Sequence, residues 1–351
     1  MKKGFLIAII AVIGIAVGLG IGMDKKGSNS INNIVKSSAN NGTSNNFNNN
    51  SSNNGVSIGS GNESNSNGSS SNGGDSSSNS SSNTTSSSLQ SKATIGLKNQ
   101  AALSSLAPQY LDEFANIINQ SNQITLRTNK GSINEMTNAQ YQVANLWMNE
   151  LSKLYSNIEE NLTPEEISLL KQEQDAWSNY KENAMNHYAN QTSLQSSLDK
   201  ATQYSNIIQE RCYYLFFYYL DNNDNTNLDL RKLLNLEDIT SINETQNSAN
   251  KFISSMGTSA SDLATDYNVL NNMWTDEING TYEILSNQYG SDAAGYYLKT
   301  PELEWINAKS NEMNIAGEFY NSDSMKLIAE YKVSIALTKA RTFILTNELD
   351  N

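Results

Sequence analysis

Apolar residues recur at intervals of three and four from about Thr94 onward, which is the spacing of amphipathic α-helices. One stripe of large apolar residues consists of Leu103, Leu106, Leu111, Phe114 and Ile117. The next stripe consists of Tyr141, Ala144, Trp147, Leu151, Tyr155 and Ile158. Pro108 falls within the first stripe, so we expect the first helix to be interrupted or to begin near it. Since the helical spacing persists to the end of the chain, it predicts an all-α fold.

The sequence predicts two more helices, the first of them from a start signal. In Thr163-Pro164-Glu165-Glu166 a capping residue is followed by proline at the first helical position and by glutamate three residues after the cap. This pattern predicts that a third helix begins there. A fourth helix is predicted from about Ser193 to Leu220, with the apolar positions Leu198, Ile207, Ile208, Cys212, Leu215 and Phe216.

A spaced pattern of tryptophan, tyrosine, tryptophan and arginine occurs twice. The separation between the first tryptophan and the tyrosine is 8 residues in both windows, Trp147 to Tyr155 and Trp274 to Tyr282. The separation between the two tryptophans is 30 residues in one window and 31 in the other, and from the second tryptophan to the arginine it is 34 and 36. A period of about 127–130 residues is too long for a solenoid repeat. It predicts two tandem antiparallel helical bundles, a first copy at 93–222 and a second copy at 223–351.

The second copy repeats the start signal in weaker form. Ser291 stands 14 residues before Trp305, just as Thr163 stands 14 residues before Trp177. We therefore expect Ser291-Asp292 to cap the matching helix. Pro301 falls inside that helix, so we expect a break near Thr300 and a restart at Pro301-Glu302.

The N-terminal 92 residues differ from the rest. The run from Phe5 to Ile21 lacks charge and follows two lysines, which predicts a single transmembrane helix within residues 1–26. The lysines at the extreme N-terminus predict that the soluble part lies outside the cytoplasm, at the cell membrane, although Lys25 and Lys26 reduce the charge contrast. The alternative is a cleaved signal peptide with a small-x-small site at Ala16-Val17-Gly18, which would make the protein secreted. Residues 27–92 are mostly Asn, Ser and Gly and predict a disordered tether.

Acidic charge is concentrated beyond this tether. Residues 1–92 hold six of the 23 basic and three of the 36 acidic residues, so residues 93–351 hold 17 basic and 33 acidic, a net charge of −16. Such a surface disfavours nucleic acid and attracts cationic partners. Cys212 is the single cysteine, so no intramolecular disulfide can form.

Residues for catalysis or metal binding are scarce. With one histidine, His187, and one cysteine, neither a typical zinc site nor a Ser-His or Cys-His nucleophile can be assembled. We interpret His187 as a lone exposed helical residue. The segment from Asp221 to Asp229 resembles a calcium loop, but Thr226 replaces its glycine and Lys232 its last glutamate, which favours an ordinary polar linker. We therefore expect no catalytic, cofactor or metal site.

The segment from Gln174 to Lys181 resembles the family of lysozyme-inhibitor LprI-like domains, which are small helical modules of the bacterial envelope. The resemblance extends to Leu151–Tyr155 and to Arg211–Leu215. In the second copy Ile278, Tyr282, Trp305, Arg341 and Leu345 match, while Glu302 and Ala308 replace the glutamine and the tyrosine. The cysteines of the family are missing, and Lys181 replaces its arginine. The signature residues, which we interpret as structural, are Trp147, Leu151, Tyr155, Gln174, Trp177, Tyr180, Arg211, Leu215, Trp274, Ile278, Tyr282, Trp305, Arg341 and Leu345.

Most of these residues have a ready structural explanation. Trp147 and Trp177, on facing helices, would hold a bundle together by burying large aromatic surfaces. Arg211 would extend to solvent or pair with an acid such as Glu150. The matches therefore identify a fold rather than a site.

The resemblance implies a binding or inhibitory role in the bacterial envelope, and a net charge of −16 suits a cationic target such as lysozyme. Together with the N-terminal run and the scarcity of catalytic residues, it predicts a membrane-anchored protein that is not an enzyme. The alternative is a sensor or scaffold module that binds a peptide or another envelope protein. A carboxylate-dependent wall hydrolase would need two opposed acids in a wide cleft, and the sequence signals none.

Overall fold

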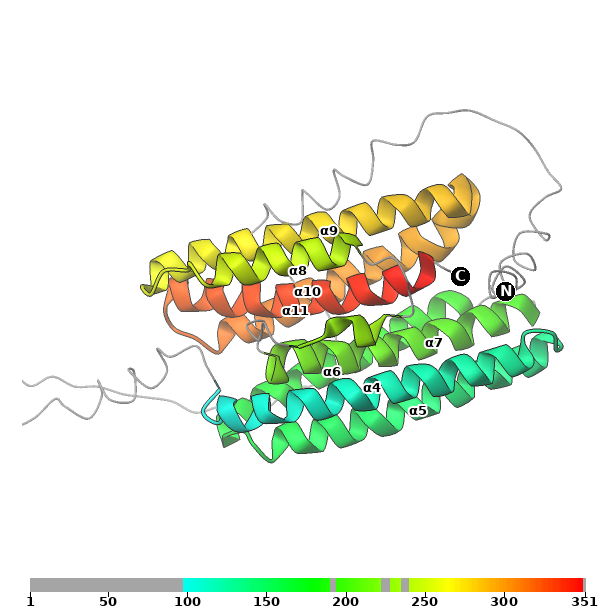
Figure 1. Ribbon diagram of the computed structural model, residues 1–351, viewed down its shortest axis with the longest axis horizontal. Helices are drawn as coiled ribbons and strands as arrows, with labels where there is room; N and C mark the ends of the chain where they lie inside the picture. The colour runs from blue at the N-terminus through cyan, green and yellow to red at the C-terminus, as the bar shows by residue number, and fades with distance from the viewer. Residues whose placement is uncertain (1–96, 190–193, 222–227, 235–239, 350–351) are drawn as a thin grey trace, which may run out of the picture. The chain divides into compact units, whose positions relative to one another are not determined.

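The computed structural model describes residues 97–189, 194–221, 228–234 and 240–349, and this part of the chain is entirely helical (Figure 1). It contains eight α-helices and no β-strand, so the all-α prediction is confirmed for the described residues. The expected transmembrane segment and tether lie outside them. Among the described helices, none combines the length and the apolar character that a bilayer crossing requires.

The first copy consists of four long helices. They are α4 (Gln100–Thr128), α5 (Ile133–Glu159), α6 (Pro164–Ala189) and α7 (Leu194–Leu215), and α7 continues into a π-helical turn, η1 (Phe216–Leu220). Helix α5 packs along α7, while α4 packs on α5 and α6 on α7. Helix α7 is therefore the central element of this copy.

Capping boxes begin two of these helices. At the start of α6 the Thr163 amide donates to Glu166 Oε2 at 2.8 Å, and the Glu166 amide donates back to Thr163 Oγ1 at 3.3 Å. The predicted start of the third helix is thus confirmed. At the start of α5, Ser132 and Glu135 make the same reciprocal pair.

Pro108 neither interrupts nor begins the first helix, so that expectation was wrong. Helix α4 runs through it from Gln100 to Thr128. Pro108 is exposed, so the Ser104 carbonyl, which it deprives of a donor, is near water. Leu103, Ala107 and Leu111 beside it are buried, and their packing holds the helix together.

The second copy repeats this arrangement. Its elements are α8 (Thr240–Ile253), α9 (Ala260–Ala294), a π-helical turn η3 (Gly295–Lys299), α10 (Thr300–Glu318) and α11 (Asp323–Leu349). Helix α9 packs along α11 as α5 packs along α7, and α8 and α10 take the positions of α4 and α6. The short helix η2 (Leu230–Leu233) lies on α4. The sequence repeat therefore corresponds to a repeat of helix packing.

Two irregularities interrupt the helices of the second copy. Gly290 has φ 74° and ψ 169°, a conformation that favours glycine, and it kinks α9 one residue before the expected cap at Ser291. The side chains of Ser291 and Asp292 lie outside the described residues, so the cap stays a prediction. The break expected near Thr300 was wrong in form, because the chain passes from the π-helical turn into α10 without leaving the helix. Pro301 lies in the first turn of α10, where an absent amide costs little.

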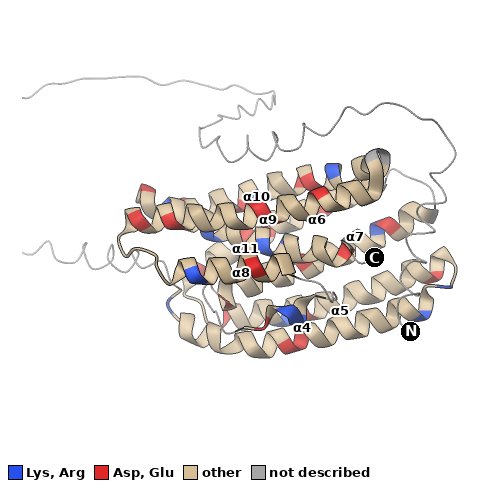
Figure 2. Cartoon of the chain, turned by 45° about the horizontal axis from the view of Figure 1, so that its top comes forward, with Lys and Arg blue, Asp and Glu red and all other residues tan. Residues whose placement is uncertain are grey.

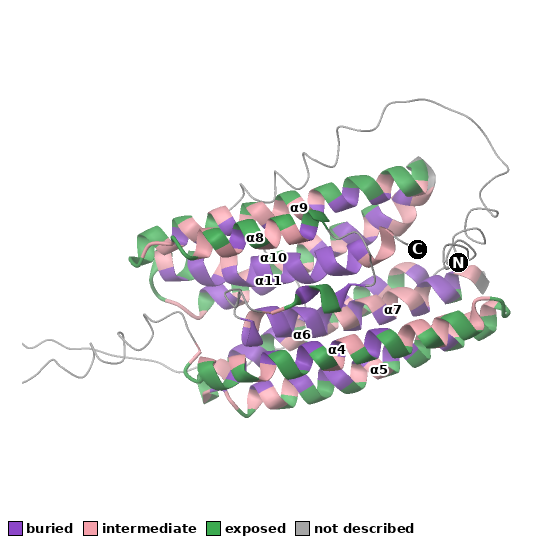
Figure 3. Cartoon of the chain, viewed as in Figure 1, coloured by how far each residue is buried: buried purple, intermediate pink, exposed green. Residues whose placement is uncertain are grey.

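The two copies pack together through equivalent helices, because α6 contacts α10 and α7 contacts α11. We call this contact the seam. Each helix meets its own counterpart, as in a two-fold symmetric dimer interface. Every side chain of α11 from Lys332 to Thr346 is buried, and Figure 3 shows this helix coloured as buried along much of its length. All described residues belong to one compact unit, while the domain boundary at residue 222 stays a prediction.

Candidate functional site

The duplicated tryptophan and arginine residues form the same contact in both copies, and both contacts lie at the seam. The guanidinium carbon of Arg211 lies 5.8 Å from the centre of the Trp177 ring, and that of Arg341 lies 6.0 Å from Trp305. In each copy a lysine four residues after the tryptophan also covers its ring, Lys181 at 4.8 Å and Lys309 at 5.3 Å. The repeated spacing in the sequence thus places the same cation–aromatic cluster twice.

A third member of each cluster also matches. The Nε atom of Arg211 donates to Gln174 Oε1 at 3.2 Å, and the Nε atom of Arg341 donates to Glu302 Oε2 at 3.3 Å. Gln174 and Glu302 each stand three residues before the tryptophan. The second copy therefore keeps the hydrogen bond but replaces a neutral amide with a carboxylate.

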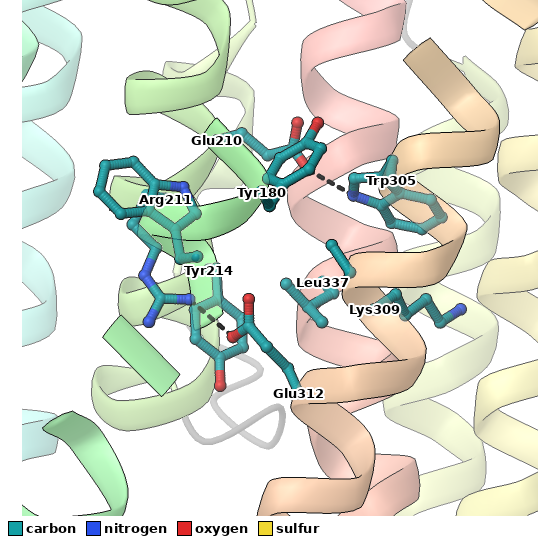
Figure 4. A pocket seen from close by; sticks show the side chains of 10 residues that line it. Tyr180, Glu210, Arg211, Tyr214, Trp305, Lys309, Glu312 and Leu337 are labelled. Atoms are coloured by element: carbon teal, nitrogen blue, oxygen red, sulfur yellow. Dashed lines mark hydrogen bonds and ion pairs between the residues drawn. The ribbon is translucent and has the colours of Figure 1, made fainter. Parts of the chain in front are cut away.

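The two arginines reach across the seam to glutamates of the other copy. Arg211 Nη1 donates to Glu312 Oε2 of α10 at 2.7 Å, and Figure 4 shows the two side chains pointing toward each other. Arg341 Nη1 donates to Glu210 Oε2 of α7 at 3.1 Å. Trp305 Nε1 donates to the other oxygen of Glu210 at 2.5 Å. Each copy therefore supplies a counter-ion for the arginine of the other.

Arg211 pairs with an acid, as one of the two expectations had it, but the acid is Glu312 and not Glu150. The expectation that its side chain extends to solvent was wrong, because only 1 % of it is exposed. Glu150 lies instead beside Glu113, and burial together with this second carboxylate raises the pKa of Glu150 to about 7. The pairing of Arg211 was missed because Glu312 lies 101 residues further along the chain, in the other copy.

Carboxylates outnumber arginines in the seam. Glu173, Glu210, Glu302 and Glu312 are all buried there with Arg211 and Arg341. Burial raises the pKa of Glu173 and of Glu210 to about 7, since a charged carboxylate loses its hydration there. The pKa values of Glu302 and Glu312 are also raised by burial, although their arginine partners oppose the effect. The seam therefore favours at least partial protonation near neutral pH.

A small cavity lies among these groups. Its lining consists of Trp177, Tyr180, Glu210, Arg211, Tyr214, Trp305, Ala308, Lys309, Glu312 and Leu337 (Figure 4). It has room for about one water molecule, which is far smaller than a typical ligand pocket. Ala308 lines it at the position where the first copy has Tyr180. The seam in this conformation is therefore a packed polar core and not an open cleft.

The remaining signature residues lie in the interior of each copy. Trp147 of α5 packs against Phe114 and Tyr213, with ring centres 5.6 Å and 5.7 Å away. Trp274 of α9 lies 5.3 Å below the ammonium group of Lys339, which bonds Asp221 at 3.1 Å. The others buried along these helices are Leu151, Leu215, Ile278, Tyr282 and Leu345, while Tyr155 is half-buried. Helices α5 and α6 each pack on α7, so Trp147 and Trp177 do not face each other as expected.

His187 differs from its predicted state. It is half-buried near the end of α6, and its ring centre lies 4.9 Å from that of Tyr188 and 5.3 Å from that of Tyr296. Tyr296 belongs to η3 of the second copy, so no residue near His187 in the sequence indicates this contact. Within the described part of the chain, no group of three or more His, Cys, Asp or Glu side chains could hold a metal ion.

The solvent-facing surface carries many exposed acids. Helix α9 has six acidic residues and no basic one, and Asp262, Asp276 and Glu283 are exposed at multiples of seven residues along it. On α6, Asp175 and Glu182 are exposed with the same separation of seven. Figure 2 colours acidic residues red on the helices, among mostly tan residues that carry no charge. A separation of seven places them on one face of each helix.

Comparison with known proteins gives one match. No curated protein and no solved structure matches the chain. The family model described as lysozyme inhibitor LprI matches residues 127–215, which extend from the end of α4 through α5 and α6 to the end of α7. The comparison therefore confirms, over residues 127–215, the resemblance of the first copy to the lysozyme inhibitor LprI family.

Proposed function

We propose that this protein is an extracytoplasmic envelope protein that binds and inhibits a lysozyme-type wall hydrolase. The observation that carries this proposal is the match of residues 127–215 to the lysozyme inhibitor family. The matched residues include α5, α6 and α7. Helix α7 is largely buried, whereas α5 and α6 each keep an exposed outer side that a partner can reach, and we place the contact on α6 because its outer side carries exposed acids.

The charge of the surface supports a basic partner. Asp175 and Glu182 on the outer face of α6 are exposed, and Lys181 between them is held over the Trp177 ring. Exposed acids steer a cationic protein toward this face and raise the rate of association. Salt screens such steering, because at about 0.15 M ionic strength the Debye length is roughly 8 Å.

The test is a wall-lysis assay with lysozyme and increasing amounts of the fragment 94–351, at low and at moderate ionic strength. We expect inhibition that weakens as salt rises. The double variant Asp175→Asn, Glu182→Gln should inhibit less than the parent fragment. The control variant Asp276→Asn, Glu283→Gln makes the same two charge changes with the same spacing on α9, outside the matched domain, and should retain more inhibition.

Absence of inhibition at low salt with an excess of fragment would remove lysozyme as the target. Capture of one endogenous envelope protein would then favour a sensor or scaffold module. Equal weakening by both double variants would instead show that overall charge matters more than the face of α6.

We also propose that the N-terminal run from Phe5 to Ile21 anchors the protein in the cell membrane. The run has no charged residue, and lysines flank it on both sides. It lies outside the described residues, so the proposal rests on the sequence. An anchor followed by a long polar tether would place the acidic helices near the wall, where a lytic enzyme acts.

A further inference from the structure

Glu173 is a fully buried carboxyl group without a cationic partner of its own. Its exposed fraction is 0 %, and one of its oxygens, Oε2, accepts a hydrogen bond from the Tyr219 hydroxyl at 3.0 Å. The other oxygen, Oε1, has no partner within the described part of the chain. An ionised carboxylate in this environment would be costly, because burial removes its hydration.

The cation that acts on Glu173 is Arg211, and its guanidinium already donates to two other residues. Its Nη1 atom donates to Glu312 across the seam at 2.7 Å, and its Nε atom donates to Gln174 at 3.2 Å. Its third nitrogen, Nη2, is buried and has no partner among the described residues. The Tyr214 hydroxyl is buried beside Glu173 and lowers the pKa of that carboxyl by hydrogen bonding.

These unused atoms belong to one cluster. Glu173 electrostatically influences Arg211, Tyr214 and Tyr219, and its own charge is opposed by that of Glu312. An arginine nitrogen and a carboxylate oxygen without partners are therefore buried in the same polar core. Arg211 Nη2 and Glu173 Oε1 could form a second ion pair, but they are not bonded to each other in this structure.

We propose that Glu173 is a proton-controlled switch that decides whether Arg211 bonds Glu312 across the seam or Glu173 within the first copy. With Glu173 protonated, Arg211 has a single anionic partner, Glu312 of α10. This ion pair holds the two copies together at the seam. When Glu173 loses its proton, its charge attracts the Arg211 guanidinium and repels the carboxylate of Glu312. The bond between α7 and α10 then weakens, and the seam loosens.

The groups that face Glu173 set the direction of this switch. They are Arg211 and Tyr214 from α7, Tyr218 and Tyr219 from η1, and Glu312 from α10. Burial, and then the charge of Glu312, raise the pKa of Glu173 from 4.5 to about 7. A raised pKa means that the closed seam holds a proton which the open, hydrated seam releases. The closed form is therefore favoured most below pH 4.5, and this advantage is lost as the pH rises to about 7.

The experiment compares the 94–351 fragment with its Glu173→Gln variant between pH 5 and 8. Glutamine resembles the protonated carboxyl and cannot ionise. Hydrogen exchange of α6 and α10 amides, corrected for the intrinsic effect of pH, measures opening of the seam. In the parent, the opening constant should rise between pH 5 and 7 and then level off, and release of the Glu173 proton contributes up to about tenfold per pH unit to this rise. In Glu173→Gln the opening constant should rise less steeply with pH, because the variant has no proton to release at this position.

A second measurement reports the partner exchange itself. Selective nitrogen-15 labelling of arginine allows the Arg211 side-chain signals to be followed by NMR. They should shift with a midpoint near pH 7 in the parent and stay constant in Glu173→Gln. The variant Glu210→Gln is the matched control, because it also removes a buried seam carboxyl but leaves Glu173, Arg211 and Glu312 intact, so the Arg211 shift should persist.

The proposal does not depend on lysozyme binding, so failure of inhibition leaves it standing. Identical slopes in the parent and in Glu173→Gln would overturn it. Arg211 signals that do not change between pH 5 and 8 in the parent would overturn it as well. If Glu173→Gln unfolds, the parent NMR titration alone decides the question.

Discussion

Gln174 and Glu302 occupy equivalent positions of the two copies and accept the same hydrogen bond from an arginine Nε atom, at 3.2 Å and 3.3 Å. They differ in charge. The first copy therefore leaves Arg211 without an acid at this position, and Glu312 of the second copy supplies it. In the second copy, Arg341 has the acid Glu302 at this position and is also bound by Glu210 of the first copy. The two copies are thus not interchangeable, although their helices are arranged alike.

Exchanging these two residues should have unequal effects on stability. Gln174→Glu adds a carboxylate beside Arg211, Glu173 and Glu312, so we expect it to lower the free energy of unfolding at pH 8 by about 1–3 kcal/mol. Glu302→Gln removes one of the carboxylates around Arg341 and should change the free energy of unfolding very little at pH 8. Urea unfolding of both single variants measures this. A larger loss for Glu302→Gln than for Gln174→Glu would contradict our account of the charge balance.

The ion pair across the seam should be difficult to break from one side. Glu312→Ala leaves Arg211 buried with an unpaired charge, which typically costs about 3–5 kcal/mol. Chemical denaturation followed by tryptophan fluorescence measures the loss. Glu318→Ala, at an exposed position of the same helix, is the control and should change stability by less than about 0.5 kcal/mol. Equal effects of both substitutions would mean that the pair contributes nothing.

Trp177 should be essential for the stability of the seam. Its side chain is 5 % exposed and lies under both Arg211 and Lys181. Trp177→Ala should lower the free energy of unfolding by about 3–5 kcal/mol, as large aromatic truncations in cores do. Leu126→Ala, a substitution of an exposed residue in α4, is the control and should have little effect. Unchanged melting of the Trp177 variant would show that its packing does not stabilise the protein.

Local patterns predicted the helices well because their causes are local. The capping pair Thr163 and Glu166 fixes a helix start within four residues, and the stripe through Trp147 follows from helical geometry. Pro108 was misjudged because packing of the residues around it outweighs one lost hydrogen bond. The seam was not predictable in the same way. Glu312 looks like any helical glutamate in the sequence, and only the packing of α6 on α10 brings it to Arg211.

The N-terminal run should anchor the full-length protein. Because Phe5–Ile21 is uncharged and long enough to cross a bilayer, the protein should remain with membranes after washing at high salt and at alkaline pH. A variant with two aspartates in the run, Ile9→Asp and Ile13→Asp, should appear in the soluble fraction. Recovery of a mature form that begins near Leu19 from the medium would show instead that the run is a cleaved signal peptide.

The stability of the whole protein should fall as the pH rises from 5 to 8. Burial raises the pKa values of Glu150, Glu210 and Glu348 from 4.5 to about 7, so the folded protein binds protons that the unfolded chain has lost. Their stabilising effect is complete below pH 4.5 and disappears as the pH rises through about 7. The melting temperature should therefore be higher at pH 5.5 than at pH 8, by on the order of 5 °C.

The sign of this effect distinguishes buried from exposed acids. Glu135 is fully exposed and accepts hydrogen bonds from Ser132, which lower its pKa and act in the opposite direction, at more acidic pH. Glu210→Gln should therefore reduce the difference in melting temperature between pH 5.5 and pH 8, because one of the protons concerned is lost with the carboxyl. Glu135→Gln should leave that difference unchanged, since Glu135 is ionised throughout this range. A protein that melts at a higher temperature at pH 8 than at pH 5.5 would mean that the seam carboxylates are ionised and well paired in the folded state.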